Sequence, residues 1–466
     1  MCTDIIEKID KEIDNARPLL VSDTIHFVSI RSVQEDPLPG APFGEGPKKM
    51  LDEFMKIAED DGFYVKDYGV GVVSASMREG DADLGIWIHG DVVHEGEGWS
   101  FSPYDAVEYN GCIIGRGAGD NKGQLAAIYN LFKIFRKLGV ELKYNAAIYL
   151  GSNEETGMKD IIGIPENPDA KGFLNVCEPP RLSLVPDGGF PVGYGGKGGL
   201  NIKLKSKSPL EVLSFCAGEK GTPGLATAKF YEKVQIIGDV SDCALSDDES
   251  ELSAFTPPRH GSNPDPNGNM ITKLTSALID KTDIPENDKK ILSVLHDLSL
   301  DVYGEAAGIS VESDIMGRLT SFPKKVAMKD GAPEIMLNIR YPAGITFEKI
   351  VEKIREFAEK REFEISEINR GVDAYIMDKN SDMVRFLCDT ANSVTGENSE
   401  PFTMSGGTYA HRLPNAYVFG TSANCPPEDF EKGRGGVHGI DEAVSIDRLI
   451  RMMKIYARAL IGLNSF

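Results

Sequence analysis

The sequence predicts an α/β protein in which helices layer a sheet and a second domain is inserted into the first. Residues 1–195 alternate short apolar runs with amphipathic segments, which is typical of a sheet covered by helices. A glycine-rich hinge then begins a long stretch with several polar, proline-rich loops, and the alternation returns near the C-terminus. We therefore predict a first domain made of residues 1–197 and 377–466, with residues 198–376 inserted as a second domain.

The apolar runs place the main elements of the first domain. Residues 86–88, 146–150 and 175–177 are candidate buried strands. Apolar residues recur every three or four positions over 122–138 and Gly139 supplies a stop, so this segment is predicted to be a helix crossing over the sheet. The first domain should be completed by an amphipathic segment at 383–391, an apolar run at 416–419 and a closing helix with Leu449, Met452, Met453, Tyr456 and Leu460 on one face.

Charge and cysteine usage exclude several classes of partner. The chain has 50 Lys and Arg against 72 Asp and Glu, a net charge of −22, which repels phosphate backbones and anionic membrane surfaces. We therefore expect neither nucleic acid nor membrane partners. The seven cysteines are scattered and form no C-x-x-C pair, which indicates reduced thiols and a cytoplasmic location.

Polar clusters follow the candidate strands, and in an open α/β sheet ligands bind at the carboxyl ends of strands. His89 and Asp91 follow the first run, Asp120 lies in a glycine-rich loop before the predicted helix, and Glu154 and Glu155 follow the second run. Each cluster alone has a simpler explanation, because a His-x-Asp is often a capped turn, an Asp before a helix is often its N-cap, and paired glutamates are often solvated.

Two later loops complete a possible metal-binding set. Asp187 lies in a tight Pro-Asp-Gly-Gly-Phe-Pro loop, and His438 precedes the closing helix. Together with the earlier clusters they supply two imidazoles and several carboxylates, the mixed nitrogen and oxygen ligands that Zn²⁺, Mn²⁺ or Co²⁺ accept. Two ions bridged by one carboxylate would need such a set.

The ordered motifs resemble the co-catalytic zinc peptidases and deacylases, which include carboxypeptidase G, acetylornithine deacetylase, succinyl-diaminopimelate desuccinylase, aminoacylase and carnosinase. The motifs are His-x-Asp-Val-Val at 89–93, Gly-Arg-Gly-x-x-Asp-x-Lys-Gly at 115–123, Glu-Glu-x-Gly at 154–157 and Gly-x-His-x-x-Asp-Glu at 436–442. The resemblance spans nearly the whole chain, and the loop at 186–191 is similar to that of the bacterial dipeptidase branch known as PepV. It implies a mixed, mainly parallel sheet and an inserted α+β lid domain.

The resemblance also implies two divalent ions, with Zn²⁺ expected and Mn²⁺ or Co²⁺ as alternatives. The implied ligands are His89 and Asp187 for one ion, Glu155 and His438 for the other, and Asp120 as the bridge. Glu178 follows the run at 175–177 and competes with Asp187 for the fourth position. The Pro-Asp-x-x-Phe-Pro context favours Asp187.

The same resemblance assigns catalytic roles. Glu154 is left without a metal and would act as general base on an activated water, then pass the proton to the leaving amine. Asp91 would fix the orientation of His89. A cis peptide bond is expected between Asp120 and Asn121.

The predicted lid and one further loop supply the expected substrate contacts. His260 and Asn269 belong to a motif similar to the lid motif of the family, whose histidine stabilises the oxyanion. Arg340 would bind the substrate's terminal carboxylate in a bidentate pair, although a strand arginine could instead pair with a surface acid. Dipeptidase relatives commonly have Arg after Tyr-Ala, where this chain has His411 and then Arg412, so their role stays open. The glycine loop is expected to line the pocket through Gly406, Gly407 and Thr408.

The sequence thus predicts a di-metal dipeptidase that cuts dipeptides or very short peptides. An N-acyl amino acid deacylase such as a desuccinylase is the alternative enzyme, because the catalytic set is shared. A non-catalytic peptide-binding protein on the same fold is the alternative of another class. The inserted domain is long enough to contain two lid units in one chain, so we expect a monomer in which His260 serves its own site.

Overall fold

The chain divides into two compact units in a computed structural model that describes residues 2–164, 167, 169–218, 224–256, 269–421, 426–431 and 433–466. Unit 1 comprises Met1–Gly195, Met377–Phe402 and Thr408–Phe466, and unit 2 comprises Gly196–Ile376 and Thr403–Gly407. The chain therefore leaves unit 1 at the predicted glycine hinge and returns to it at Met377. The short segment 403–407, placed by the sequence in the first domain, groups with unit 2.

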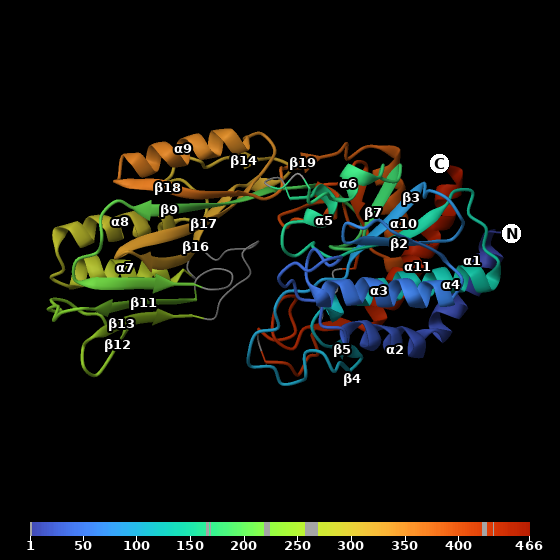
Figure 1. The fold of residues 1–466 in the computed structure, drawn as a ribbon, viewed down its shortest axis with the longest axis horizontal. Helices are drawn as coiled ribbons and strands as arrows, with labels where there is room; N and C mark the ends of the chain where they lie inside the picture. The colour runs from blue at the N-terminus through green and yellow to red at the C-terminus, as the bar shows by residue number, and fades with distance from the viewer. Residues whose placement is uncertain are drawn as a thin grey trace. The chain divides into compact units, whose positions relative to one another are not determined.

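A mixed sheet forms the centre of unit 1 (Figure 1). Its strands run in the order β1-β2-β6-β3-β7-β21-β8, and the β6, β3, β7 and β21 neighbours are parallel. The antiparallel pairs β1–β2, β2–β6 and β21–β8 flank this parallel centre. The bounds are β1 Tyr64–Asp67, β2 Val72–Ser76, β3 Leu84–His89, β6 Ala146–Gly151, β7 Leu182–Val185, β8 Gly193–Gly196 and β21 Ala416–Val418.

Two of the three predicted strands are confirmed, and one is wrong. Every residue of β3 and of β6 is buried, as expected for parallel strands covered on both faces. Residues 175–177 do not form a strand, because Phe173–Val176 is a short helix, α6, and the strand follows at β7. Phe173 is fully buried whereas Val176 is 45% exposed. A three-residue segment is too short to show a periodicity that separates a helical turn from a strand.

Helices surround this sheet, and the predicted crossover helix is confirmed. α4 begins at Gly123 and ends at Leu138, and Gly139 caps it with φ +63°. Further helices are α1 Cys2–Asn15, α2 Arg17–Val28, α3 Glu45–Asp60, α5 Lys159–Ile162, α10 Asp382–Thr395 and α11 Ile446–Gly462. Single turns occur at η1 Ala118–Lys122, η2 Tyr409–His411 and η3 Leu463–Ser465.

The C-terminal segments Met377–Phe402 and Thr408–Phe466 belong to unit 1. α11 packs against α1 and α4, and both chain ends lie in this unit (Figure 1). A small antiparallel sheet, in the order β22-β5-β4, joins a C-terminal strand to two earlier ones. Its strands are β4 Val107–Tyr109, β5 Cys112–Ile114 and β22 Ala443–Ser445.

Unit 2 is built on an antiparallel sheet with strand order β12-β13-β11-β10-β16-β17-β9-β18. Burial alternates along β9, and one hydrophobic core combines this sheet with α7, α8 and α9. The strands are β9 Gly198–Ser206, β10 Leu213–Ala217, β11 Leu225–Phe230, β12 Ala244–Leu245, β13 Glu251–Phe255, β16 Thr320–Lys329, β17 Ala332–Tyr341 and β18 Phe363–Arg370. The helices are α7 Met270–Lys281, α8 Glu286–Leu300 and α9 Phe347–Glu359.

The remaining short strands are β14 Glu312–Ser313, β15 Gly317–Arg318, β19 Tyr375–Ile376 and β20 Phe402–Met404. β14 and β15 form a two-stranded hairpin. No helix in the described part of the chain combines the length and apolar character needed to cross a bilayer.

Candidate active site

The polar clusters of unit 1 follow neighbouring parallel strands. His89 is the last residue of β3, Glu154 and Glu155 follow the end of β6, and Asp187 follows the end of β7. Because these three strands are parallel neighbours, their carboxyl ends meet at one edge of the sheet. Asp120 comes from the η1 turn that leads into α4.

Two groups of potential metal ligands share one residue. His89, Asp120 and Asp187 form one group, and Asp120, Glu155 and His438 form the other. Within each group the ligand atoms lie within 4.8 Å of one another. The structure thus brings together the same five residues that the motifs single out, with Asp120 common to both groups.

Asp120 faces one imidazole with each of its carboxylate oxygens. Its Oδ1 lies 2.8 Å from His89 Nε2, and its Oδ2 lies 3.0 Å from His438 Nε2. His438 Nε2 is also 3.0 Å from the carboxylate of Glu155. A carboxylate in this arrangement is suited to bridge two ions. The peptide bond between Asp120 and Asn121 is cis, as the resemblance implies.

The alternative ligand Glu178 lies elsewhere. Its side chain is exposed just beyond α6, and it belongs to neither ligand group among the described residues. Asp187 instead sits with His89 and Asp120. The misassigned strand at 175–177 explains the ambiguity, because the strand that ends at the site is β7, directly before the loop of Asp187.

Buried carboxylates dominate the electrostatics of the cluster. Burial raises the pKa of Asp187 to about 7, and the charge of Asp120 adds to this shift. Burial also raises the pKa of Glu154 well above its usual value, with a further contribution from Asp187. Burial disfavours the charged form of His438, but its hydrogen bonds to Asp120 and Glu155 raise the pKa of the imidazole to about 11. Closely spaced acids of this kind favour bound cations.

Glu154 differs from its neighbour Glu155. It belongs to neither ligand group, its exposed fraction is 9%, and its Oε1 has no hydrogen-bond partner among the described residues. A buried polar atom without a partner calls for a bound group or a functional role.

Asp91 contacts the site differently from the expectation. His89 Nδ1 lies 3.0 Å from the backbone oxygen of Asp91 and 3.7 Å from its carboxylate. The carboxylate oxygens instead accept the backbone N–H groups of Glu154 and Glu155, each at 3.1 Å. The Asp91 backbone therefore orients the imidazole, and its side chain holds the glutamate turn.

A buried ion pair that the sequence reading did not assign supports two of the candidate ligands. Glu442 accepts the N–H groups of Gly119 and Asp120 at 2.9 and 3.1 Å, and it pairs with Arg116. Arg116 also donates to the backbone oxygens of His438 and Gly439. Arg116 lies in the motif at 115–123 and Glu442 in the motif at 436–442. Their positions in these motifs are the only indication of this pair that the sequence contains.

The expected lid residues have separate local settings. Asn269 is the N-cap of α7 and accepts from Ile271 N at 3.0 Å. Arg340 lies in β17 opposite Gly199 of β9, where a side chain on Gly199 would collide with the guanidinium. His260 lies outside the described residues.

The glycine loop is divided between the two units. Gly406 and Gly407 group with unit 2, whereas Thr408 belongs to unit 1. Thr408 caps η2 by accepting from Ala410 N, and its own N–H donates to His411 Nδ1 at 3.2 Å. His411 thus has a local structural use in this turn.

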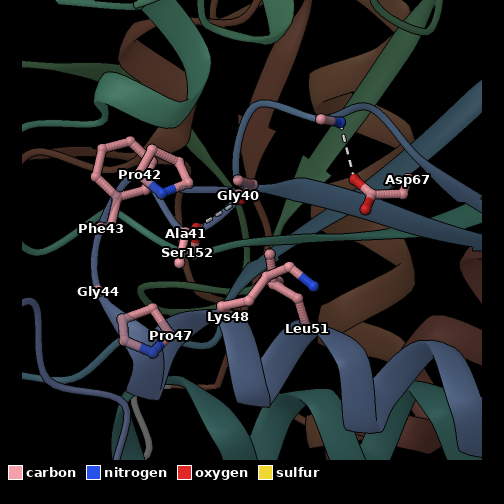
Figure 2. A pocket seen from close by; sticks show the side chains of 12 residues that line it. Gly40, Ala41, Pro42, Phe43, Gly44, Pro47, Lys48, Leu51, Asp67 and Ser152 are labelled. Carbon is pink, nitrogen blue, oxygen red and sulfur yellow. Dashed lines mark hydrogen bonds between the residues drawn. The ribbon is translucent and has the colours of Figure 1, made fainter. Parts of the chain in front are cut away.

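A small pocket lies beside the turn that follows β6 (Figure 2). Its volume is about 30 Å³, and its lining includes Phe43, Lys48, Asp67 and Ser152. This space suits a water molecule rather than a peptide. None of the ligand-group residues lines it.

Comparison with known proteins places the chain in a family. It is 26% identical over 476 residues to a Staphylococcus epidermidis protein named "Putative dipeptidase", covering 95% of this chain and 97% of that protein. The Bacillus subtilis protein named "Putative dipeptidase YtjP" is 27% identical over 470 residues, with the same coverage. The fold is similar to that of human carnosine dipeptidase 1, with a TM-score of 0.61 and 15% identity over 99% of both chains. The family model described as peptidase family M20/M25/M40 matches residues 85–462. The chain therefore belongs to peptidase family M20/M25/M40.

Proposed function

We propose that this peptidase is a dipeptidase that uses two divalent metal ions to hydrolyse the amide bond of dipeptides or very short peptides. The observation that supports it most directly is the pair of ligand groups that share Asp120, next to the unliganded carboxylate of Glu154. The names of the relatives point to the same substrate class.

The residues present fit two such ions. Two imidazoles and three carboxylates give each ion nitrogen and oxygen ligands, with Zn²⁺ as the expected metal and Mn²⁺ or Co²⁺ as alternatives. His89 and Asp187 would hold one ion, Glu155 and His438 the other, and Asp120 both. When bound, the ions would polarise the scissile carbonyl and lower the pKa of water.

Glu154 would move the protons of the reaction. Its unpaired Oε1 can accept a proton from the attacking water, and the same carboxyl can then donate this proton to the leaving amine. Burial raises the pKa of Glu154, which makes the protonated form accessible for the second step. Asp91 would keep the glutamate in place through the N–H groups of residues 154 and 155.

Unit 2 would supply substrate recognition. Arg340 would pair with the free carboxylate of the substrate, for which a planar guanidinium is well suited. His260 would stabilise the oxyanion, and Asn269 with the glycine loop would complete the contacts. These roles are implied by the resemblance of the motifs to those of the family.

A substrate screen tests the proposal. The purified protein would be loaded with Zn²⁺, Mn²⁺ or Co²⁺ and offered dipeptides, N-acetyl amino acids and N-succinyl amino acids. We expect the dipeptides to be cleaved with the higher kcat/KM. Preferred cleavage of the acylated amino acids would instead identify a deacylase, and no turnover of any substrate by metal-loaded protein would indicate a binding protein.

We also infer that one chain is sufficient for activity. Among its described residues, unit 2 contains one sheet of eight strands in a single chain, which is long enough to provide two lid halves. His260→Ala protein would be mixed with Glu154→Ala protein, each inactive alone. Continued inactivity with a monomeric mass would support the monomer, whereas recovered turnover would mean that His260 acts on a partner's site.

A further inference from the structure

The turn after β6 is held by two buried aspartates. Asp160 accepts the backbone N–H groups of Ser152 and Asn153 at 2.8 and 3.1 Å. Asp91 accepts those of Glu154 and Glu155. The N–H groups of four consecutive residues, 152–155, therefore donate to buried carboxylates. The last two of these residues are the proposed general base and a proposed metal ligand.

We propose that Asp160 and Tyr409 act as a positioning pair that fixes the Glu154–Glu155 turn for catalysis. This inference rests on the proposed function. Tyr409 donates its hydroxyl to Asp160 Oδ2 at 2.5 Å, and the same oxygen accepts from Ser152 and Asn153. Neither residue is a metal ligand or contacts the reacting atoms in this proposal, so both would act through the turn.

A glycine at the end of β6 leaves space for this pair. Asp160 and Tyr409 are both buried, and they meet beside Gly151, the last residue of β6. A Cβ on Gly151 would lie 2.0 Å from the tyrosine hydroxyl and 2.5 Å from Asp160 Oδ2. Only glycine leaves room for both groups, so the close approach depends on this residue.

Tyr409 also contacts the strand that bears His89. Its ring packs edge-on against His89, with centroids 6.5 Å apart and an interplanar angle of 84°. It packs against Trp87 of the same strand in the same way, with centroids 6.2 Å apart. One side chain thus touches a candidate ligand of one ion and supports the turn that carries a candidate ligand of the other.

Further anchors limit where the turn can move. The Ser152 hydroxyl donates to the backbone oxygen of Gly71 at 2.7 Å, beside the small pocket (Figure 2). The Asn153 amide donates to Gln34 Oε1 at 3.2 Å. These bonds hold the start of the turn from one side, while Asp160 holds its backbone from another.

A role in packing alone accounts poorly for Asp160. Its Oδ1 is buried and has no hydrogen-bond partner among the described residues, and a buried carboxylate is costly compared with an apolar side chain. Burial raises the pKa of Asp160 to about 7, and the nearby charge of Asp91 adds to the shift. The ionised form of Asp160 is therefore disfavoured both by burial and by a neighbouring acid. Its benefit lies in the three donors that it orients together.

Kinetics of Asp160 and Tyr409 variants test the pair. Removal of residues that orient a metal site typically lowers activity about 10- to 100-fold. We expect a decrease of this size in kcat for Asp160→Ala and a smaller one for Asp160→Asn, which keeps an acceptor oxygen. Tyr409→Phe should also lower kcat, with KM nearly unchanged and the metal content retained.

The matched control is Tyr144→Phe. Tyr144 lies before the opposite end of β6, and its hydroxyl donates to Leu460 O. This variant loses a tyrosine hydroxyl that is partly buried and hydrogen-bonded, and it should keep its kcat. The double variant Asp160→Asn/Tyr409→Phe should lose no more than the worse single variant, because both act through one turn. Equal kcat in Tyr409→Phe, Asp160→Asn and Tyr144→Phe would overturn the proposal.

Amide hydrogen exchange separates this inference from the proposed function. Exchange at residues 152–155 should accelerate in metal-loaded Asp160→Ala and Asp160→Asn but not in Tyr144→Phe. This readout needs no substrate, so it still tests the turn if the wild type cleaves no dipeptide. Unchanged exchange in Asp160→Ala would overturn the positioning role even if hydrolysis fell.

Discussion

The main sheets of the two units place their polar residues differently. In unit 1 the central strands β6, β3 and β7 are parallel neighbours, so their carboxyl ends deliver His89, Glu155 and Asp187 to one edge. In unit 2 the sheet is antiparallel, and adjacent strands end at opposite edges. Within the described residues, both potential metal-ligand groups lie in unit 1.

This difference separates two kinds of proposed role. A parallel edge collects groups that are distant in sequence, which suits chemistry on one bond. The antiparallel strand β17 instead presents Arg340 from the face of a sheet, which suits recognition. Substitutions in unit 1 should therefore act mainly on kcat, and substitutions of Arg340 in unit 2 should act mainly on substrate selection.

The largest expected effect is that of metal removal, which acts on unit 1. Chelation should abolish turnover, because without cations neither the scissile carbonyl nor the attacking water is activated and the clustered carboxylates repel one another. Adding back Zn²⁺, Mn²⁺ or Co²⁺ should restore it. Activity and metal content would be measured on the same samples, and full turnover by metal-free protein would contradict the di-metal site.

The next effect concerns Glu154. Glu154→Gln should retain both ions and lose about 10²- to 10⁴-fold in kcat, because an amide cannot accept the proton. Glu178→Gln, at an exposed glutamate of the same unit, is the control and should behave like wild type. Loss of an ion in Glu154→Gln, with both retained in Glu155→Gln, would show that the two roles are reversed.

Arg340 should give a smaller effect of a different kind. Amidation of a good dipeptide substrate should reduce kcat/KM in the wild type, because the neutral amide cannot form the bidentate pair with the guanidinium, and loss of such a charged contact costs about 2 kcal/mol or more. Arg340→Met should lower activity on the free acid and remove the discrimination between acid and amide. Arg370→Met, which breaks an exposed pair with Asp373 in the same unit, is the control. Equal wild-type hydrolysis of acid and amide would refute the assignment.

The smallest expected effect is on the free energy of unfolding, when a helix N-cap is removed in either unit. Ser381 caps α10 in unit 1, and Thr346 caps α9 in unit 2, each through its side-chain oxygen. Replacing either with Ala should lower the free energy of unfolding by about 1 kcal/mol. Denaturant melts would measure this, and kcat should be unchanged in both. A fall in kcat for Thr346→Ala would show that unit 2 contributes to the chemical step.

Local sequence patterns predicted the elements whose apolar pattern continues over many residues or that end at a residue that stops a helix. The helix before Gly139 follows from apolar spacing and a glycine cap, and β3 and β6 follow from apolar runs with polar residues at their ends. The run at 175–177 was too short to show a period, and there the expectation was wrong. Longer elements average over more side chains, which makes their pattern less ambiguous.

The candidate ligands were also predicted from sequence, because motif order and strand ends bring His89, Asp120, Glu155, Asp187 and His438 to one edge. Only the tertiary structure decided which hydrogen-bonding residues position these candidate ligands. The carboxylate of Asp91 serves the glutamate turn, Arg116 pairs with a residue 326 positions away, and Tyr409 meets Asp160 across 249 positions. Hydrogen bonds between such distant residues depend on how strands and loops pack, and no local spacing in the sequence determines them.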